Sequence, residues 1–461
     1  MKVIIEKFGP VKKFEYDLDK DMIVTYGNNN IGKSYAMQIV YLLLKTFIDN
    51  VYMLPRTYRP MYLYSRAIDI PLIDENIGNL VQSFMDSDED IKDITQDIVK
   101  EVYSLLSASY MPEFMNSCKN TFGNLEKTLE NNPEIKIQYN EYESVLNLKE
   151  SKMTGTINFK PVRLKKTVSD FHKSRNSKEH LDIYVVDNTE KPVELILEKI
   201  EKEFSRYVQF ISGHFGSVYF LPASRSGIYA GMNAFGSIVA ELSKNRAYFT
   251  KKIEFPGISE PISDYFIALS NIKVRSNESL KKYYSDIEDE ILKGKVTFDK
   301  TRNALMYKPD NVEALYEMTE VSSMVSEISP IVAFMKYIIP TGYRKKSAKS
   351  ILFIEEPEAH LHPYNQIALI DIFSKLIGEN VKLIMSSHSN YVFNKLNNLV
   401  LDKKLDYHLY DPIVLKETQE GSISKHISVD DLGAEDENFL DVSEALYNER
   451  EEIIEKMNME E

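Results

Sequence analysis

The chain has 461 residues, of which 43% are hydrophobic and 27% are charged, a balance typical of a globular protein large enough for two lobes. Its net charge is −14, but 13 acidic and only 2 basic residues lie between Asp430 and Glu461. The rest of the chain is nearly neutral, which argues against a strongly basic nucleic-acid-binding body. A single cysteine, Cys118, excludes a disulfide framework and a cysteine-ligated zinc site.

Membrane insertion and secretion are not expected from this sequence. No apolar run approaches the roughly 18 residues that a bilayer-spanning helix needs. The N-terminal stretch MKVIIEKFGP is too briefly apolar for a signal peptide. We therefore expect a cytoplasmic protein without membrane partners, and the single cysteine fits a reducing compartment.

The first strong motif lies between a predicted strand and a predicted helix. Met22 to Tyr26 is a short β-branched and apolar strand, and the following residues fit the pattern G-x-x-x-x-G-K-[ST]. Backbone N–H groups of such a loop point at phosphate oxygens, the lysine reaches the β- and γ-phosphates, and the hydroxyl ligates Mg²⁺. The motif predicts an ATP site and consists of Gly27, Asn28, Asn29, Asn30, Ile31, Gly32, Lys33 and Ser34.

The next segment, 46–214, carries no nucleotide motif. Residues 45–130 are expected to be mainly helical, and the alternation from Ile135 to Phe159 predicts a hairpin-rich β lobe. The basic run from Arg163 to Lys178 is interpreted as a solvated loop in preference to a contact with phosphates.

Further strands and helices are predicted from residue 215 onward. Val218 to Leu221 is a strand that opens into a Ser/Arg/Gly loop, in which Arg225 either contacts phosphate or forms a structural ion pair. Residues 228–292 are expected to be mostly helical, and Gly294 to Pro309 a hairpin. Small hydroxyl residues, including Ser322 and Ser323, precede an apolar helix; by themselves they indicate only a capped helix N-terminus.

A buried strand with two carboxylates at its end organises the chain. In ILFIEEPEAHLHP, Ile351–Pro363, four apolar residues run directly into Glu355 and Glu356. In open α/β sheets, ligands bind outside the carboxyl ends of the strands. Another buried strand, Val381 to Met385, ends beside His388, for which a contact with the γ-phosphate is one interpretation and a structural role the other.

These motifs together resemble one family. The order GNNNIGKS, VSSMVSE, ILFIEEPEAHLHP and LIMSSHSN resembles the ABC/SMC-like AAA ATPases of the OLD and RecF branch. The resemblance covers about residues 1–45 and 215–450 and predicts an α/β fold, an ABC-type P-loop ATPase head with a mixed sheet, helical insertions and a small β lobe. We expect 1–45 and 215–420 to form the head, 46–214 an insertion, and 421–461 an acidic hairpin and helix.

The resemblance also implies a mechanism. Members of this family bind ATP and Mg²⁺ between two subunits, so Ser322 and Ser323 of one copy would contact the γ-phosphate held by the P-loop of the other. Glu356 would be the catalytic base, Glu355 would hold Mg²⁺ although the family more often has Asp there, and His388 would be the switch histidine. The segment Ala359–His362 would match the loop that crosses the dimer, and no glutamine is assigned to the usual Q-loop.

The biological role expected from this resemblance involves a second protein. OLD nucleases carry a TOPRIM domain after the ATPase, but the segment after His388 is too short for one. The layout is similar to the ATPase subunits of two-gene phage-defence systems such as PARIS or Septu. We expect a homodimeric unit or higher oligomer that hydrolyses ATP slowly, acts as sensor or scaffold for a separate nuclease or toxin, and responds to a phage-encoded trigger.

The alternative is a RecF/SMC-like DNA-repair ATPase that clamps DNA. A transporter subunit is disfavoured by the motif EEPEAHLHP and by the insertion after the P-loop helix.

Overall fold

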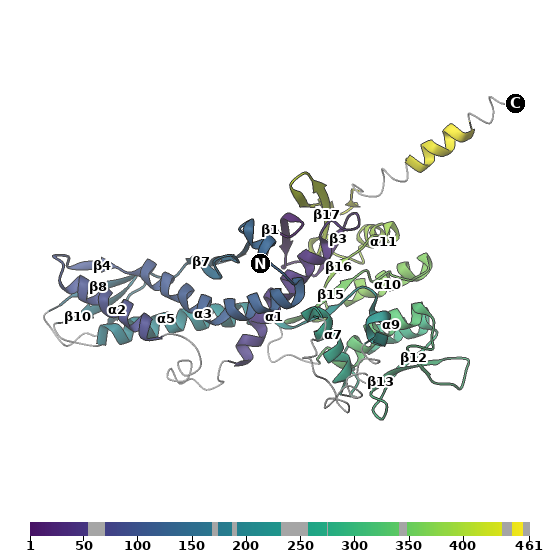
Figure 1. Ribbon diagram of the computed structural model, residues 1–461, viewed down its shortest axis with the longest axis horizontal. Coiled ribbons are helices and arrows are strands. Elements are labelled where there is room, and N and C mark those ends of the chain that lie inside the picture. Colours follow the sequence, from purple (N-terminus) through teal and green to yellow (C-terminus); the bar gives the residue numbers. More distant parts are fainter. Residues whose placement is uncertain are drawn as a thin grey trace, which may run out of the picture. The chain divides into compact units, whose positions relative to one another are not determined.

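The computed structural model describes residues 1–53, 70–167, 174–186, 191–231, 257–273, 275–340, 348–435 and 445–454. The chain divides into two compact units. The smaller unit comprises Met1–Phe8 and Leu42–Phe215, and the larger comprises Gly9–Tyr41 and Gly216–Glu461. Figure 1 labels many of their helices and strands. Among the helices that the structure describes, none combines the length and the apolar character that a bilayer-crossing segment needs.

A mixed sheet forms the centre of the larger unit. Its strands follow the order β11-β15-β16-β3-β17-β18-β2. The neighbours β15 and β16, β16 and β3, and β3 and β17 are parallel, whereas β17 and β18 are antiparallel. The strands are β2 (Val11–Asp17), β3 (Met22–Tyr26), β11 (Phe215–Leu221), β15 (Lys349–Glu355), β16 (Val381–Ser386), β17 (Tyr410–Thr418) and β18 (Gly421–His426).

Helices bury both faces of this sheet, which explains why its central strands are continuously apolar. On one face, Leu352 and Ile354 of β15 belong to the core that includes buried residues of α9, α10 and α11. On the other face, Phe353 packs against Tyr41 of α1, with ring centroids 5.9 Å apart. The helices are α1 (Lys33–Met53), α7 (Glu260–Ser270), α9 (Ser323–Ala333) with its π-helical extension η4 (Phe334–Ile338), α10 (Pro363–Leu376) and α11 (Asn390–Leu401).

A lobe between β11 and β15 in the sequence contains the predicted hairpin. β12 (Gly294–Asp299) and β13 (Ala304–Pro309) pair antiparallel over the whole expected range, so this prediction is confirmed. The lobe also includes β14 (Tyr316–Glu317), α8 (Lys281–Asp286) and the π-helical turn η3 (Ile287–Leu292). Part of the predicted helical stretch 228–292, residues 232–256, lies outside the described residues.

The C-terminal hairpin is part of the central sheet. We expected a separate segment from 421 onward, but β17 pairs with β3 and β18 pairs with β2. The boundary at 420 therefore falls inside a hairpin, because the turn at Gly421 is a local signal that does not show where the two strands dock. The short strands β19 (Val429–Asp430) and β20 (Gly433–Ala434) follow, with the 3-10 turn η5 (Tyr407–Leu409) before β17 and a helix at 445–454 after them.

The smaller unit combines antiparallel strands with long helices. One set of strands follows the order β1-β5-β6-β7 and another the order β4-β8-β10-β9. Tyr103 of α3 donates a hydrogen bond to the backbone carbonyl of Glu143 in β6, and this contact joins helix to sheet. The elements are β1 (Lys2–Phe8), β4 (Ile91–Asp93), β5 (Glu134–Tyr139), β6 (Tyr142–Asn147), β7 (Lys152–Ile157), β8 (Val162–Lys166), β9 (Ser174–Asn176), β10 (Leu181–Val185), α2 (Ile70–Met85), α3 (Thr95–Phe122), α4 (Glu126–Glu130) and α5 (Lys191–His214).

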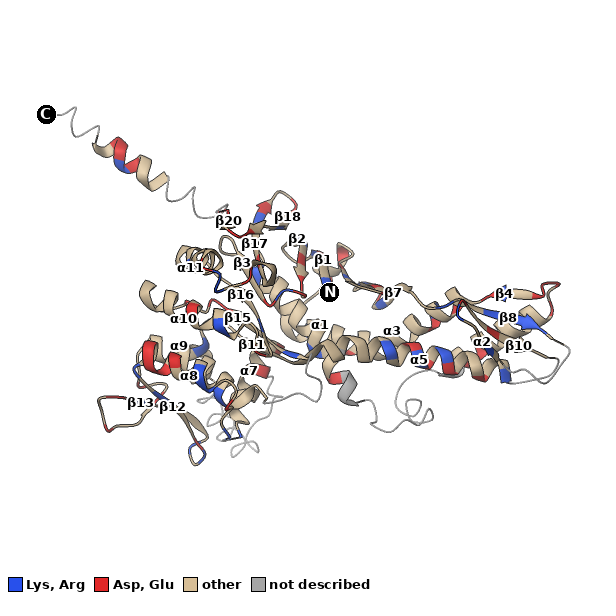
Figure 2. Ribbon diagram, turned by 180° about the vertical axis from the view of Figure 1, so that it is seen from behind, with Lys and Arg blue, Asp and Glu red and all other residues tan. Residues whose placement is uncertain are grey.

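The interpretation of Arg163 to Lys178 as a solvated loop is wrong for its described parts. Its first part forms β8, whose basic residues are blue in Figure 2, and a later part forms β9; residues 168–173 lie outside the described residues. Arg163 lies 2.8 Å from the Asp182 carboxylate on the neighbouring strand β10. Its charge is therefore paired within the sheet. Because Asp182 lies on another strand, the local charge pattern does not reveal this pairing.

Candidate functional site

The loop between β3 and α1 adopts positive φ angles that its glycines allow. Gly27 has φ +139° and Gly32 has φ +101°, in the region that side chains rarely adopt. A Cβ added at Gly27 would lie 2.6 Å from the Leu415 carbonyl oxygen, so any other residue would collide with β17. Asn30, at φ +61°, occupies the left-handed region that asparagine tolerates. The residue pattern thus produces a curled loop that places its N–H groups ahead of α1.

Lys33 is buried at the start of α1. Its ammonium donates hydrogen bonds to the carbonyls of Gly27 at 2.9 Å and Asn28 at 2.6 Å, which hold the side chain against the loop. Burial lowers the pKa of Lys33 to about 8, while the nearby carboxylates of Glu356 and Glu358 act in the opposite direction. A partly desolvated ammonium in this position is suited to a phosphate group.

Parallel pairing brings the ends of three strands to one edge of the sheet. Glu355 lies opposite Ser386, and Ser386 lies opposite Thr25. The loop that begins at Gly27 and the carboxylates at Glu355 and Glu356 therefore meet at the carboxyl edge, where α/β sheets bind ligands. This is the spatial arrangement that the sequence predicted for motifs more than 300 residues apart.

A hollow of about 490 Å³ at this edge contains most of the predicted site. Lys33, Ser34, Glu356 and His388 all line it. Ser322 and Ser323 are not among the described residues that surround it. Its other lining residues are Pro10, Asn29, Asn30, Gly32, Tyr35 and Ser386.

Glu355 is buried and precedes Glu356 in the chain, but it is not itself among the residues that line the hollow. Its Oε2 accepts a hydrogen bond from the Ala223 backbone N–H at 3.1 Å, but its Oε1 is buried without a hydrogen-bond partner among the described residues. Burial raises the pKa of Glu355, and the side chain of neighbouring Ser34 opposes the rise. An unsatisfied carboxylate oxygen beside a serine hydroxyl provides the hard oxygen donors that Mg²⁺ prefers.

The fit to Mg²⁺ depends on this pair of donors. Among the described residues, no group of three or more His, Cys, Asp or Glu side chains could hold a metal ion. Mg²⁺ at phosphate-transfer sites is commonly bound by one or two protein oxygens, with phosphates and waters completing its octahedron. Ser34 and Glu355 meet that requirement.

Glu356 is directed into the hollow by an unusual backbone conformation. Its φ of +43° lies in the left-handed region, which non-glycine residues adopt only when the surroundings impose it. Its N–H donates to the Ser386 carbonyl at 3.1 Å, and its carboxylate Oε1 lies 3.6 Å from His388 Nε2. Because the side chain is 42% exposed, it can contact water as well as the imidazole.

His388 is held by a carboxylate to which we assigned no role in the sequence. Glu358 Oε1 accepts hydrogen bonds from the His388 N–H at 2.8 Å and from the Ser387 hydroxyl at 2.6 Å. Its Oε2 is buried without a partner among the described residues, and burial raises its pKa. Burial and the charge of Lys33 lower the pKa of His388, which favours a neutral imidazole at neutral pH.

Arg225 forms a structural ion pair, which settles the two interpretations left open by the sequence. The side chain is fully buried, and its Nε lies 3.4 Å from Oε2 of the equally buried Glu327. Glu327 belongs to α9, and sequence reasoning assigned it no role. Ser322 caps that helix through a hydrogen bond from the Val325 N–H, so the expected helix cap is confirmed.

Comparisons with known proteins identify the family of this chain. The family described as "AAA ATPase domain" matches residues 1–393. Similar solved structures include the SMC head domain from Thermotoga maritima and an SMC head bound to the C-winged helix domain of ScpA. Each is 10% identical, with 93% of this chain and 98% of that chain covered and a TM-score of 0.35. No curated protein matches the chain. Because the family match extends over most of its length, this chain belongs to the AAA ATPase domain family and is an ATPase.

Proposed function

We propose that two copies of this ATPase bind ATP between them and that larger oligomers are built from this dimeric unit. The supporting observation is that Lys33, Ser34, Glu356 and His388 surround one hollow. Ser322 and Ser323 stand at the N-terminus of α9 and do not line it. A second copy would add the positive end of its own α9 to the γ-phosphate.

Each residue of the hollow has a distinct role in this proposal. The loop from Gly27 to Gly32 surrounds the phosphates, and the Lys33 ammonium neutralises the β- and γ-phosphate oxygens. Ser34 and Glu355 would hold Mg²⁺, which neutralises charge on the phosphates when bound. Glu356 orients a water and accepts its proton, and neutral His388 hydrogen-bonds the γ-phosphate. With few groups to stabilise charge until a second copy arrives, the isolated chain hydrolyses ATP slowly.

We further propose that ATP turnover controls a separate effector nuclease or toxin in bacterial anti-phage defence, in response to a phage-encoded trigger. Two observations support a separate effector. The described residues contain no group of three or more His, Cys, Asp or Glu side chains that could hold a nuclease metal. The acidic C-terminal helix at 445–454 exposes Leu446, Tyr447, Ile453 and Ile454, whose spacing places them on one helical face where a partner could bind.

A phage-plating assay tests this role. The gene is expressed with and without its neighbouring gene, in wild-type form and as Lys33→Ala. We expect protection only when both genes are present and only with intact Lys33. If the purified protein alone cuts nucleic acid in a metal-dependent way, the proposal of a separate effector is wrong.

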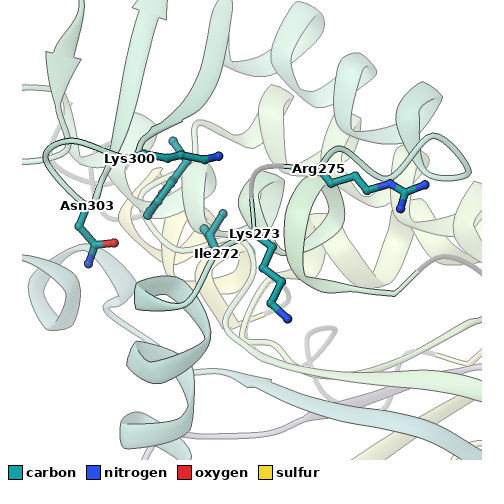
Figure 3. Close-up of a pocket in the computed structure, with 6 residues that line it drawn as sticks. Ile272, Lys273, Arg275, Lys300 and Asn303 are labelled. Atoms are coloured by element: carbon teal, nitrogen blue, oxygen red, sulfur yellow. The ribbon is translucent and has the colours of Figure 1, made fainter.

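A DNA-clamping ATPase is the second candidate, and a basic surface favours it. A hollow of about 460 Å³ in the larger unit is lined by Lys273, Arg275 and Lys300, with Ile272, Phe298 and Asn303. Figure 3 shows the charged ends of Lys273, Arg275 and Lys300 lying apart from one another, an arrangement that suits an extended polyanion better than one small ion.

This candidate predicts DNA binding that ATP strengthens and salt weakens. Replacing Lys273 and Lys300 by alanine would reduce the slope of affinity against salt concentration by about 1 for each lost phosphate contact. Lys281→Ala is the matched control, because Lys281 is exposed in the same lobe and pairs with Glu278. DNA affinity that neither ATP nor the double substitution changes would exclude this candidate.

A further inference from the structure

We propose that Arg225 is a positioning residue that couples α9 to the backbone of Glu356. The inference rests on the proposed roles of Glu356 as base and of α9 as the helix that meets ATP from a second copy. It adds a route within one chain by which the position of α9 determines whether Glu356 is correctly oriented. Neither residue of the ion pair lines the ATP hollow.

The guanidinium of Arg225 holds the turn on which Glu356 is mounted. Its Nη1 donates to the Glu355 carbonyl at 2.8 Å and to the Pro222 carbonyl at 3.1 Å, and its Nη2 donates to the Glu356 carbonyl at 3.2 Å. The carbonyls of Glu355 and Glu356 are consecutive, and they lie on either side of the left-handed backbone conformation of Glu356. The planar guanidinium holds these carbonyls in directions fixed by its fork of donors, whereas the compact ammonium of a lysine has rotatable donors and does not impose that geometry.

The other side of the same arginine is attached to α9. Its Nε donates to the Glu327 carbonyl at 3.0 Å, and its backbone N–H donates to Glu327 Oε2 at 3.0 Å. Glu327 Oε1 accepts from the Ser226 N–H at 3.1 Å and from the Ser226 hydroxyl at 2.6 Å. Both carboxylate oxygens are thus satisfied, so the pair has little freedom to move independently of the helix.

Glu327 lies one helical turn after Ser323. The hydroxyl of Ser326, next to Glu327, donates to the Ser322 and Ser323 carbonyls, each at 3.2 Å. A displacement of the α9 N-terminus therefore reaches Glu327, then Arg225, and then the carbonyl of Glu356. Because buried ion pairs contribute little net stability compared with apolar residues of similar volume, this location indicates a role beyond stability.

Substitutions at both ends of the pair test the coupling. Glu327→Gln removes the charge but keeps an acceptor, and Arg225→Lys keeps the charge but loses the fork. We expect ATP affinity within about two-fold of wild type and kcat lowered by about ten- to a hundred-fold, since small misplacements of catalytic groups have effects of this size. Thermal unfolding of each variant is measured in parallel.

Asp21→Asn is the matched control for a purely structural effect. It removes a buried ion pair with Lys382 at the opposite edge of the same strands, 3.2 Å between Oδ1 and Nζ. We expect this variant to lose stability without losing kcat. If its kcat falls as far as that of Glu327→Gln, Arg225 and Glu327 have no positioning role.

Ser226→Ala is a milder second variant if either single variant fails to fold. It removes one hydrogen bond to Glu327 Oε1 and keeps the Arg225 fork and the backbone N–H donors to Glu327. We expect kcat to fall about two- to ten-fold at a near wild-type unfolding temperature; an unchanged kcat overturns the inference. The proposed function itself fails differently, by Glu356→Gln hydrolysing ATP as fast as wild type, so the two failures are distinguishable.

Discussion

The parallel strands β3, β15 and β16 differ between their amino ends, here called the amino edge of the sheet, and their carboxyl ends, the carboxyl edge, in how nearby charges are paired. At the amino edge, Asp21 forms ion pairs with Lys349 and Lys382, and the Lys382 ammonium also donates to the carbonyls of Leu18 and Lys20. At the carboxyl edge, Glu355 and Glu358 each keep a buried oxygen without a partner among the described residues. At their amino ends, β3, β15 and β16 thus meet a paired charge network, and at its carboxyl end β15 leads into carboxylates with unpaired oxygens.

This difference indicates where the fold serves stability and where it serves binding. A buried polar atom without a partner destabilises the protein, and a ligand at the Glu355 carboxylate would supply the missing interaction. The left-handed backbone of Glu356 adds strain at the same edge. We therefore expect substitutions at the carboxyl edge to alter ATP turnover and substitutions at the amino edge to alter stability.

The largest effect is expected from Lys33→Ala. Loss of the ammonium removes the charge that meets the β- and γ-phosphates, so ATP hydrolysis should fall by more than about 1000-fold. Nucleotide affinity is measured by calorimetry and hydrolysis by phosphate release. Unchanged nucleotide affinity in this variant would remove the phosphate-binding role of the loop.

Glu356→Gln should lower hydrolysis by about 100- to 1000-fold, because the amide cannot accept the proton of water. ATP affinity should remain, and ATP should stabilise the dimer. Phosphate release and size-exclusion chromatography with ATP check both parts. A variant that turns over ATP at the wild-type rate would show that the base lies elsewhere.

At the amino edge, Asp21→Asn should lower the free energy of unfolding by about 2 kcal/mol, because it leaves two lysines without their carboxylate. The rate of ATP hydrolysis should stay close to wild type. Chemical denaturation and phosphate release are measured on the same preparation. A large loss of kcat without a loss of stability would contradict the division between the two edges.

The pH dependence of ATP affinity should reflect Lys33. Its pKa of about 8 means that the ammonium loses its proton as pH rises through that value. If only the protonated form binds the phosphates, the dissociation constant for ATP should increase about ten-fold between pH 7 and pH 9. A dissociation constant that does not change over this interval would show that the charge of Lys33 does not contribute to binding.

The smallest expected effect is a gain in stability from Glu355→Gln. Burial raises the pKa of Glu355 in the folded state above its unfolded-state value. The protonated side chain therefore contributes fully to the free energy of unfolding below the unfolded-state pKa, and this contribution is lost as pH rises through the folded-state pKa. The amide removes the buried charge, and the thermal midpoint should rise by a few degrees at pH 8 and less at pH 5. A lower midpoint at pH 8 would mean that the carboxylate stabilises the fold.

The parts of the site encoded in short contiguous patterns were predictable. The loop from Gly27 to Ser34 and the strand ending at Glu355 each show their local structure within a few residues, and their proximity followed from placing both at a sheet edge. The partners of Arg225 and Glu358 were not predictable in the same way. Glu327 is distant in sequence from Arg225 and follows no periodic pattern with it, and Glu358 accepts from the backbone N–H of His388, in the segment that follows β16.

The same distinction applies to the fold. The hairpin from Gly294 to Pro309 was predicted because its strands and turn are adjacent, whereas the docking of β17 on β3 depends on residues from opposite ends of the chain. Arg163 was assigned to a loop for the same reason, since its partner Asp182 lies on another strand. Long-range pairing is what the sequence pattern leaves open.

The most direct test of the account is a structure of the Glu356→Gln variant with ATP and Mg²⁺. We predict that the γ-phosphate lies within hydrogen-bonding distance of the Lys33 ammonium and faces the side chain at position 356, with Mg²⁺ beside Ser34 and Glu355. ATP bound elsewhere, or bound at the loop with its γ-phosphate directed away from position 356, would contradict it.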